Sequence, residues 1–168
     1  MNELNLTIAP ETPDDQGAID RLNERTFGPG RYARSAYRIR EGRAHLPELS
    51  FTARIGTLLV GSVRLTPVCI GETPALLLGP LTVEPPFRER GVGSALIKKA
   101  LSQAKTQGHK LVVLVGDEPS YAKSGFKRIA KGQVKMPGPV DPARLLVAEL
   151  MPGAFDGVSG LIRPDWEK

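Results

Sequence analysis

Short runs of apolar residues recur along the chain and predict most of its strands. The segments on either side of Gly56 predict two antiparallel strands that meet at this glycine. The run 111–115 has no polar position, which is typical of a strand covered on both faces. The predicted strands are residues 4–8, 49–55, 57–66, 75–83, 111–115 and 145–150.

Helical periodicity, with apolar residues three or four positions apart, marks the other ordered segments. The acidic residues of 12–15 stand where a helix dipole favours negative charge, so a helix is predicted from there to Gly28. The apolar stripe of 91–107 predicts a longer helix, for which Gly108 is the C-terminal cap. The other predicted helices are residues 31–41 and 120–124.

Length and composition favour one domain over residues 1–168. The chain has 168 residues, of which 40% are hydrophobic and 24% charged, the balance of an ordinary globular protein. The core is expected within 4–150, and the Gly- and Pro-rich tail 151–168 shows no clear pattern. No apolar run approaches the roughly 18 residues of a membrane helix, and the N-terminus lacks the pattern of a secretory signal. A cytoplasmic location and no membrane partner are therefore expected.

Cysteine and histidine are too few for a disulfide or a recognisable metal site. Cys69 is the only cysteine, and its apolar neighbours predict an unreactive strand position. His45 and His109 are far apart and give no ligand spacing for zinc. No metal is expected, and His109, which follows the predicted helix cap, is interpreted as structural.

The basic charge of the chain raises the possibility of a nucleic-acid partner. The formal net charge is +5 and the pI about 9.6. Aromatic residues make up only 5% of the chain, which leaves little for base stacking. The densest basic stretch, 21–43, is mixed with acidic residues and is interpreted as a solvated helix face. A small ligand that carries several phosphates would also account for a basic surface, and no nucleic-acid partner is expected.

The most informative segment, 75–117, predicts a strand, a loop, a helix and a second strand. Two strands joined through one helix are expected to be parallel, with a right-handed crossover. In the loop, Gly91 and Gly93 allow close approach of the backbone, and the free amides of the helix's first turn favour a phosphate or pyrophosphate. Arg88 and Arg90 add positive charge. A tight turn with close helix packing is the alternative interpretation.

Two other phosphate-binding motifs are excluded by the residues themselves. A P-loop needs Gly, four residues and then Gly-Lys-Ser/Thr, and no segment of the chain matches. A dinucleotide fingerprint needs a small residue three positions after the second glycine and a strand directly before the loop. Here that position is Leu96, and Pro85-Pro86 intervenes.

Gly79-Pro80 lies in the middle of the predicted strand 75–83. Proline cannot donate a ladder hydrogen bond and is seldom found inside a central strand. One interpretation is an edge strand, or two separate pieces. The other is a bulge at which this strand separates from strand 111–115, which would open a wedge and leave backbone groups of 81–83 free for a ligand.

Two motifs follow each other along the chain, with a helix and a strand between them. The first is Arg-x-x-Gly-x-Gly at 88–93, preceded by Leu-Thr-Val-Glu-Pro at 81–85, and the second is Tyr-x-x-x-Gly-Phe at 121–126. This ordered pair resembles the acetyl-CoA signature and the later tyrosine signature of the GNAT N-acetyltransferase superfamily. The segment 27–31 and the Leu-Val-Gly-Asp run before Tyr121 resemble a bacterial branch of predicted acetyltransferases.

The resemblance implies a fold and a reaction. The fold is an α/β (α+β) acyl-CoA N-acyltransferase type, a mixed, mostly antiparallel sheet of about seven strands with a central splayed parallel pair and helices on both faces. The reaction is transfer of the acetyl group of acetyl-CoA to a primary amine of a small molecule or peptide, by direct attack and without a metal. A homodimer is compatible with it.

The resemblance also implies which residues hold acetyl-CoA. Backbone groups of the bulged strand would hold the pantetheine arm, and the amide of Leu81 or its neighbour would polarise the thioester carbonyl. The pyrophosphate would lie on the amides of the glycine loop. The implied cofactor-binding residues are Leu81, Thr82, Val83, Arg88, Glu89, Arg90, Gly91, Val92, Gly93, Ser94 and Lys123.

Tyr121 is the one catalytic residue that the resemblance implies. In many relatives the aligned tyrosine protonates the departing CoA thiolate, although a packing residue at a helix start is the simpler interpretation. The general base stays open. The strand before Gly79 holds no acid, while Glu72 and Glu84 on either side of it are typical of solvated turn residues. Ordered water and backbone carbonyls could take the proton instead.

The acceptor is expected to contact the segment from Phe27 to Tyr37, whose basic residues suggest a carboxylate or phosphate on the acceptor or merely a solvated face. Three other functions stay open at this point. A non-catalytic acyl-CoA sensor is favoured by the missing strand carboxylate and disfavoured by Tyr121. A longer acyl group depends on the pocket near Leu78 and Leu81. A nucleic-acid-binding protein is disfavoured by the low aromatic content.

Overall fold

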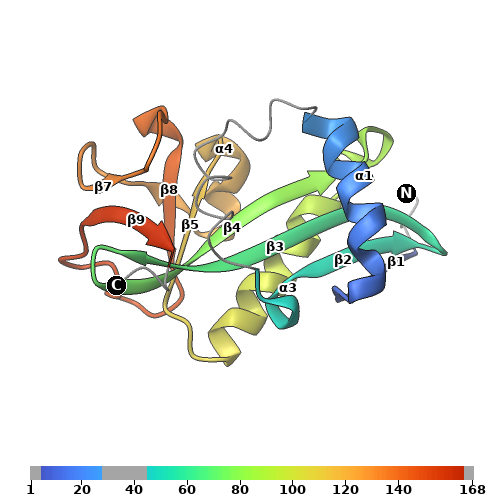
Figure 1. The fold of residues 1–168 in the computed structure, drawn as a ribbon, viewed down its shortest axis with the longest axis horizontal. Coiled ribbons are helices and arrows are strands. Elements are labelled where there is room, and N and C mark those ends of the chain that lie inside the picture. The colour runs from blue at the N-terminus through green and yellow to red at the C-terminus, as the bar shows by residue number, and fades with distance from the viewer. Residues whose placement is uncertain (1–4, 28–44, 165–168) are drawn as a thin grey trace.

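A nine-stranded sheet runs through the part of the chain that the computed structural model describes, residues 5–27 and 45–164 (Figure 1). The order is β1-β2-β3-β4-β5-β8-β6, with β9 paired to β3 and β7 paired to β9. Within these ranges only β4–β5 and β7–β9 are parallel, which confirms the mixed, mostly antiparallel sheet. The strands are β1 (Leu6–Pro10), β2 (Phe51–Ile55), β3 (Leu58–Ile70), β4 (Thr73–Val83), β5 (Leu111–Val115), β6 (Lys127–Arg128), β7 (Val134–Lys135), β8 (Leu145–Glu149) and β9 (Gly160–Pro164).

Helices cover both faces of the sheet, as expected. In Figure 1, α1 lies in front of the long strands β3 and β4, and α3 crosses behind them. No helix in the described ranges has both the length and the apolar character needed to cross a membrane. The predicted helix 31–41 lies outside the described residues. The helices are α1 (Gln16–Phe27), which follows a 3₁₀ turn at Pro13–Asp15, α3 (Val92–Thr106), and α4 (Glu118–Tyr121), which a 3₁₀ turn at Ala122–Ser124 extends.

Glycines flank α3 at its N-terminal and C-terminal ends, as the sequence predicted. Gly91 is its N-cap, with a left-handed φ of 84° that favours glycine. At the other end Gly108 has a φ of 89° and donates to the carbonyl of Lys105, while His109 donates to the carbonyl of Ala104. These two hydrogen bonds form a Schellman motif, which satisfies carbonyls that the helix leaves without partners.

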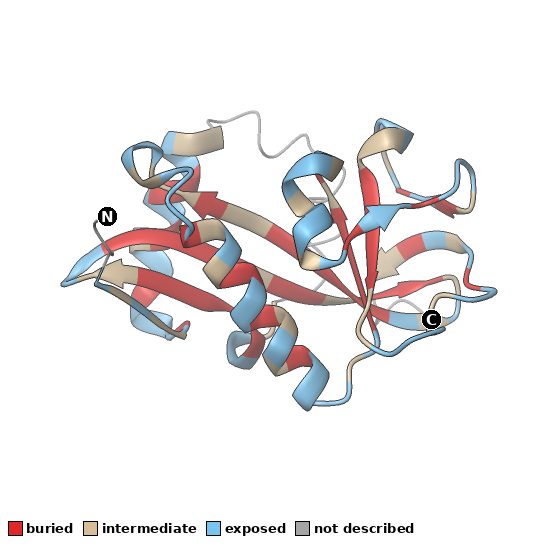
Figure 2. Cartoon of the chain, turned by 180° about the vertical axis from the view of Figure 1, so that it is seen from behind, coloured by how far each residue is buried: buried red, intermediate tan, exposed pale blue. Residues whose placement is uncertain are grey.

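The sheet separates two apolar layers. Leu59 and Val60 are neighbours on β3 and therefore point to opposite faces. Leu59 packs with Ile19 and Leu22 of α1, whereas Val60 belongs to the larger cluster that Leu96 and the other inward residues of α3 complete. Figure 2 shows that buried residues run along the long strands and recur along the helix packed against them.

Some boundaries differ from those predicted. The strand predicted at 57–66 continues to Ile70, and the one predicted at 49–55 begins at Phe51, because Leu49 belongs to a 3₁₀ turn. Gly61, which interrupts the apolar pattern of β3, marks a close contact with α3. A Cβ at this position would lie 3.0 Å from side-chain atoms of both Val92 and Leu96. A larger residue there would push α3 away from the sheet.

The tail, for which the sequence showed no pattern, contributes β9. This strand pairs with the end of β3, from Val68 to Ile70, and its Ile162 is fully buried. Together with β5, β7 and β8 it encloses a second apolar cluster on the face of the sheet opposite α3. The approach is close, since a Cβ on Gly71 would lie 2.6 Å from the carbonyl oxygen of Ser159.

A buried ionic cluster joins β1, β3 and the start of α1. The side chain of Glu11, 8% exposed as a residue, accepts from Arg64 at 2.9 and 3.2 Å, and its second oxygen lies 2.7 Å from His45 Nε2. Burial raises the pKa of Glu11, but the hydrogen bonds from His45 and Arg64 outweigh it and hold this pKa below its usual value. The folded state therefore favours the ionised carboxylate.

Replacing Glu11 by glutamine is expected to lower the free energy of unfolding by about 3 kcal/mol at pH 7, because Arg64 then keeps a buried charge without its counter-ion. The lowered pKa means that the wild type loses this contribution as the pH falls below about 4.5 and through the folded pKa. The difference in free energy of unfolding between the wild type and Glu11→Gln should therefore become smaller in acid.

Urea denaturation at pH 7 and at pH 3.5 measures this difference. Glu48→Gln is the matched control, because Glu48 is exposed and has no ion pair among the described residues. Equal losses in the two variants at pH 7 would contradict the assigned role of Glu11.

Candidate functional site

A wedge opens in the middle of the sheet, where β4 leaves β5. The two strands pair only at Leu76–Val112 and Leu77–Val113. On the other side of β4 the register with β3 slips: Val63 faces Leu81 and Leu65 faces Leu78, so one residue of β3 is opposite Gly79 and Pro80. The predicted bulge is confirmed. The edge-strand interpretation also holds in part. Before the bulge β4 lies between β3 and β5, whereas after the bulge its only partner strand among the described residues is β3.

The pairing with β3 decides which backbone groups face the wedge. The amide of Glu84 donates to the carbonyl of Val60 at 2.8 Å, so these two residues form a hydrogen-bonded pair. Hydrogen-bonded pairs alternate with non-hydrogen-bonded pairs along antiparallel strands, so the next hydrogen-bonded pair is Thr82 with Ser62. The N–H and C=O groups of Leu81 and Val83 therefore point to the open side.

Thr82 faces away from the wedge, unlike its neighbours Leu81 and Val83. Its backbone faces β3, and its side chain, in a residue only 1% exposed, donates to Asn23 Oδ1 of α1 at 2.6 Å. Within the predicted set 81–83, Leu81 and Val83 therefore have their backbone groups on the open side, while Thr82 fastens β4 to α1.

The first turn of α3 lies beside the open side of β4. A Cβ added at Gly93 would be 3.7 Å from the Val83 side chain and 3.8 Å from that of Leu81. The amides of 92–94 have no acceptor within the helix, and no side chain caps the turn. Backbone donors, the positive end of a helix dipole and the open strand therefore come together, an arrangement suited to a bound phosphate.

The loop before α3 carries three charged residues, Arg88, Glu89 and Arg90. Arg88 donates through Nε to the carbonyl of Val83 at 3.3 Å, which places its guanidinium across the open strand edge. Glu89 has a φ of 63°, and Glu89, Arg90 and Lys123 are exposed. Arg88 and Arg90 thus bring positive charge to the loop before α3, with the acid Glu89 between them.

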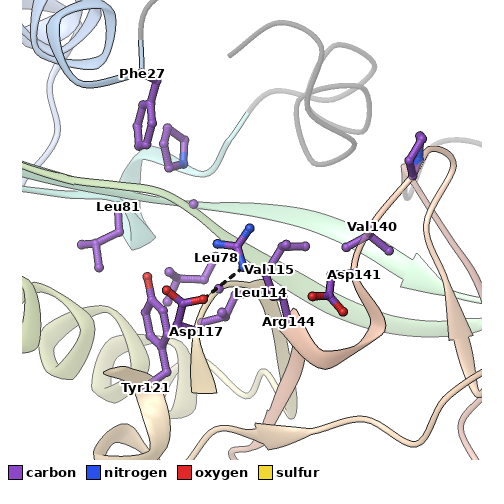
Figure 3. Close-up of a pocket in the computed structure, with 14 residues that line it drawn as sticks. Phe27, Leu78, Leu81, Leu114, Val115, Asp117, Tyr121, Val140, Asp141 and Arg144 are labelled. Atoms are coloured by element: carbon purple, nitrogen blue, oxygen red, sulfur yellow. Dashed lines mark hydrogen bonds and ion pairs between the residues drawn. The ribbon is translucent and has the colours of Figure 1, made fainter. Parts of the chain in front are cut away.

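A cavity of about 370 Å³ occupies the wedge (Figure 3). It is bounded by the bulge of β4, the end of β5, α4 and the segment before β8. Of the residues predicted for the site, Leu81 and Tyr121 line it. The full lining in the described residues is Phe27, Leu78, Gly79, Pro80, Leu81, Leu114, Val115, Gly116, Asp117, Tyr121, Pro139, Val140, Asp141 and Arg144.

Tyr121 is held in the cavity by close packing. Its ring meets Phe126 edge to face, with centroids 6.1 Å apart and an interplanar angle of 75°. On the other side it lies over Gly116, where a Cβ would be 2.5 Å from the ring carbon Cε2. In Figure 3 the phenol oxygen points toward β4, beside Leu81. Gly116 thus makes room for the tyrosine.

Three charged residues of the cavity were missed from the sequence. Arg144 donates through Nε to Asp117 Oδ1 at 3.2 Å, and Asp141 lies in the same lining. Asp117 is the second residue after β5, and a polar residue at the carboxyl end of a parallel strand was a usable signal. Arg144 had none, because its position depends on the pairing of β8 with β5.

The residues considered as general base lie elsewhere. Glu84 is paired with Arg25 of α1 at 2.7 Å. The Glu72 side chain is fully exposed in the turn between β3 and β4, 3.7 Å from Arg163. His109 lines a different cavity, of about 610 Å³, formed by the start of β4 and the chain that precedes β5. Neither glutamate lines the wedge cavity.

The expected acceptor segment and the expected absence of a metal can be followed only within the described residues. Phe27, at the end of α1, lines the cavity, whereas the rest of the predicted acceptor segment, 28–37, lies outside the described residues. Within the described ranges no three His, Cys, Asp or Glu residues are grouped so that they could hold a metal ion.

The chain is similar to known acetyltransferases over most of its length. The model of the acetyltransferase (GNAT) family matches residues 18–126. An uncharacterised N-acetyltransferase of Escherichia coli, YhbS, is 28% identical over 94% of this chain and 95% of its own. A second one, YjhQ, is 30% identical over 83% of this chain and 78% of its own.

Solved structures show the same fold. The crystal structure of YhbS from Escherichia coli in complex with CoA superposes with a TM-score of 0.82 at 26% identity, over 98% of this chain and 92% of that one. A GNAT family acetyltransferase from Brucella melitensis in complex with acetyl-CoA reaches a TM-score of 0.61 at 24% identity, over 92% of this chain and all of that one.

Gly116→Ala is expected to displace the Tyr121 ring, because a methyl group there would overlap the ring while the backbone itself permits alanine. Overpacking of this kind costs about 1–3 kcal/mol. Thermal unfolding and the NMR signals of the Tyr121 ring measure both effects. Gly17→Ala is the control, since its methyl would meet only the flexible end of Arg21 at 3.3 Å. Unchanged Tyr121 signals in Gly116→Ala would contradict the packing described.

Proposed function

This chain belongs to the acetyltransferase (GNAT) family, and on that premise we propose that it transfers the acetyl group of acetyl-CoA to a primary amine held in the wedge cavity. One observation carries the proposal. The open edge of β4 borders both the uncapped first turn of α3, beside Leu81 and Val83, and the cavity that Leu81 and Tyr121 line. Donors for a phosphate and a proton donor for a leaving group thus lie along one strand edge.

Acetyl-CoA fits the groups that surround the wedge. The amides of 92–94 would bind the pyrophosphate, with Gly91 at the cap and Arg88, Glu89 and Arg90 around it. The wedge-facing backbone groups of Leu81 and Val83 would pair with the amide-rich pantetheine arm as a strand does. Lys123, exposed after α4, would also contact the cofactor. The CoA in the structure of YhbS and the acetyl-CoA in that of the Brucella protein support this assignment.

The proposed reaction is direct attack. The amine nitrogen forms a bond to the thioester carbonyl carbon, and the bond from that carbon to sulfur breaks. The amide of Leu81, which points into the wedge, stabilises the oxyanion. An acceptor that binds as an ammonium ion first loses one proton to water, which frees the nitrogen lone pair. Tyr121 gives its proton to the CoA thiolate, and the second proton that the nitrogen loses returns through water to the phenolate. No covalent enzyme intermediate is needed.

Tyr121 is chemically suited to this step. A phenol and a thiol have pKa values of about 10 and 8.5 in water, so the proton transfer costs only about 2 kcal/mol. The packing of the ring against Gly116 and Phe126 fixes the direction of the hydroxyl. A residue needed only for packing would not require its oxygen inside the cavity. This observation favours an enzyme over a non-catalytic acyl-CoA sensor.

Calorimetric titration is expected to show one-to-one micromolar binding of acetyl-CoA to the wild type and its loss in Gly91→Glu, since a carboxylate at the uncapped turn would repel the pyrophosphate. Gly108→Glu is a matched control, because that glycine also has a left-handed φ and open space but lies at the opposite end of α3. Failure of the wild type to bind either acetyl-CoA or CoA would refute the proposed function.

Tyr121→Phe is expected to lower kcat by about 10² to 10⁴-fold and to leave the Kd for acetyl-CoA unchanged, because only the hydroxyl is removed from a packed ring. Steady-state kinetics across pH, with CoA release as the signal, measures this. An unaltered kcat would remove Tyr121 from the mechanism, and a weaker Kd would make it a binding residue instead.

A further inference from the structure

We infer that the acceptor is a small amine that carries a free carboxylate close to its nitrogen, as an α-amino acid does, and that Arg144 binds this carboxylate. The inference rests on the proposed function and deepens it. Its observations concern the three charged residues of the wedge cavity, Asp117, Asp141 and Arg144, to which the resemblance and the comparisons assign no role.

The backbone of Arg144 is fixed from two sides. Its N–H donates to the carbonyl of Asp141 at 2.9 Å, which closes the 3₁₀ turn Pro142–Arg144, and its carbonyl accepts from the amide of Gly116 at 2.8 Å. Asp141 also caps this turn, since Oδ1 accepts from the amide of Ala143 at 2.9 Å. The arginine therefore projects into the cavity from a position held by both β5 and β8.

The guanidinium of Arg144 is oriented by one hydrogen bond and has further N–H groups to donate. Nε donates to Asp117 Oδ1 at 3.2 Å, and neither Nη nitrogen has a partner among the residues that the structure describes. In Figure 3 the side chain extends across the cavity toward Asp117 and β4. Two parallel N–H groups of an arginine match the two oxygens of a carboxylate, and a neighbouring anion that holds Nε leaves this fork available.

The remaining charges in the cavity suit an ammonium group. Asp117 and Asp141 each have one carboxylate oxygen without a partner in the described residues. Within the lining, two acids and one arginine therefore face an acceptor that must bring a nitrogen to the bulge of β4 and to Tyr121. A compound with a positive amine and a negative carboxylate a few atoms apart complements both signs.

The size of the cavity restricts the acceptor further. About 370 Å³ lies at the lower end of the range for small-molecule sites, and part of this space must receive the thioester. A free amino acid fits this description. A peptide N-terminus presents an amide where the free amino acid has its carboxylate, so Arg144 would gain no charged partner from it.

The test compares three sets of acceptors at saturating acetyl-CoA, with CoA release as the signal. The sets are free L-amino acids, their primary carboxamides, and the corresponding amines that lack the carboxylate. The inference predicts that kcat/KM for the best amino acid exceeds that for its carboxamide by about 10 to 100-fold, the usual worth of a charged hydrogen-bonded contact. Equal use of the carboxamide, or transfer to none of the three sets, would overturn it.

Arg144→Gln is expected to remove this preference. The KM for the amino acid should rise about 10 to 100-fold. The kcat/KM for the carboxamide and the Kd for acetyl-CoA should stay within about twofold of those of the wild type. Arg144→Lys, which keeps the charge but loses the fork, should restore only part of the preference. A preference that survives in Arg144→Gln would overturn the role of this arginine.

Arg128→Gln is the matched control variant. Arg128 also pairs with an acid, Glu118, at 3.4 Å, but it is exposed on β6 outside the cavity. It should keep the carboxylate preference unchanged. Loss of acetyl-CoA affinity in Arg144→Gln would assign the arginine to the cofactor and contradict the inference. Calorimetry of the wild type separates these outcomes from a failure of the proposed function, which would abolish acetyl-CoA binding itself.

Discussion

The site depends on one constraint, that β4 pairs with β5 over its first half and leaves it over its second. The additional residue at Gly79-Pro80 produces this change, because it shifts the register against β3 and Pro80 has no N–H to donate to a neighbouring strand. Beyond the bulge, the backbone groups of Leu81 and Val83 face an opening instead of a strand. The cavity and the proposed position of the cofactor arm both follow from this divergence.

A strand that loses a neighbour must be held by other contacts. On one face Thr82 donates to the buried Asn23 of α1, and just beyond the strand Glu84 pairs with Arg25 of the same helix. On the other face the side chains of Leu81 and Val83 pack against the cluster completed by α3. Side-chain contacts thus replace the missing ladder on this edge. Arg88 occupies the Val83 carbonyl, and the other wedge-facing backbone groups of Leu81 and Val83 have no strand partner among the described residues.

The polar groups of the site are positioned before any substrate arrives. Gly116 serves two purposes, since the absence of a side chain admits the Tyr121 ring and its amide fixes the backbone of Arg144. The end of β5 therefore couples the proposed proton donor to the proposed acceptor contact. Groups held in this way lose little freedom when a ligand binds, which is the condition for efficient electrostatic stabilisation of a transition state.

The local pattern of the sequence by itself determined the elements whose causes are local. The apolar run of β5 and the stripe and glycine caps of α3 depend on residues close together in the chain. At Gly79-Pro80 the sequence marked the irregularity, but the pairing of β4 with β3 and β5 decided that it is a bulge. The paired motifs at 88–93 and 121–126 indicated the family, which the family model confirms, and through it they drew attention to Tyr121, which lines the cavity in the structure. Here sequence reasoning was sufficient, because spacing within one unit decides the geometry.

Only the tertiary structure decided the features that join distant segments. Which groups of 81–83 face the wedge depends on hydrogen-bond alternation with β3, so Thr82 could not be distinguished from its neighbours. β9 has no strong pattern of its own and is ordered by pairing with β3. Arg144 reaches the cavity because β8 lies beside β5, a pairing across about 30 residues that no local preference encodes.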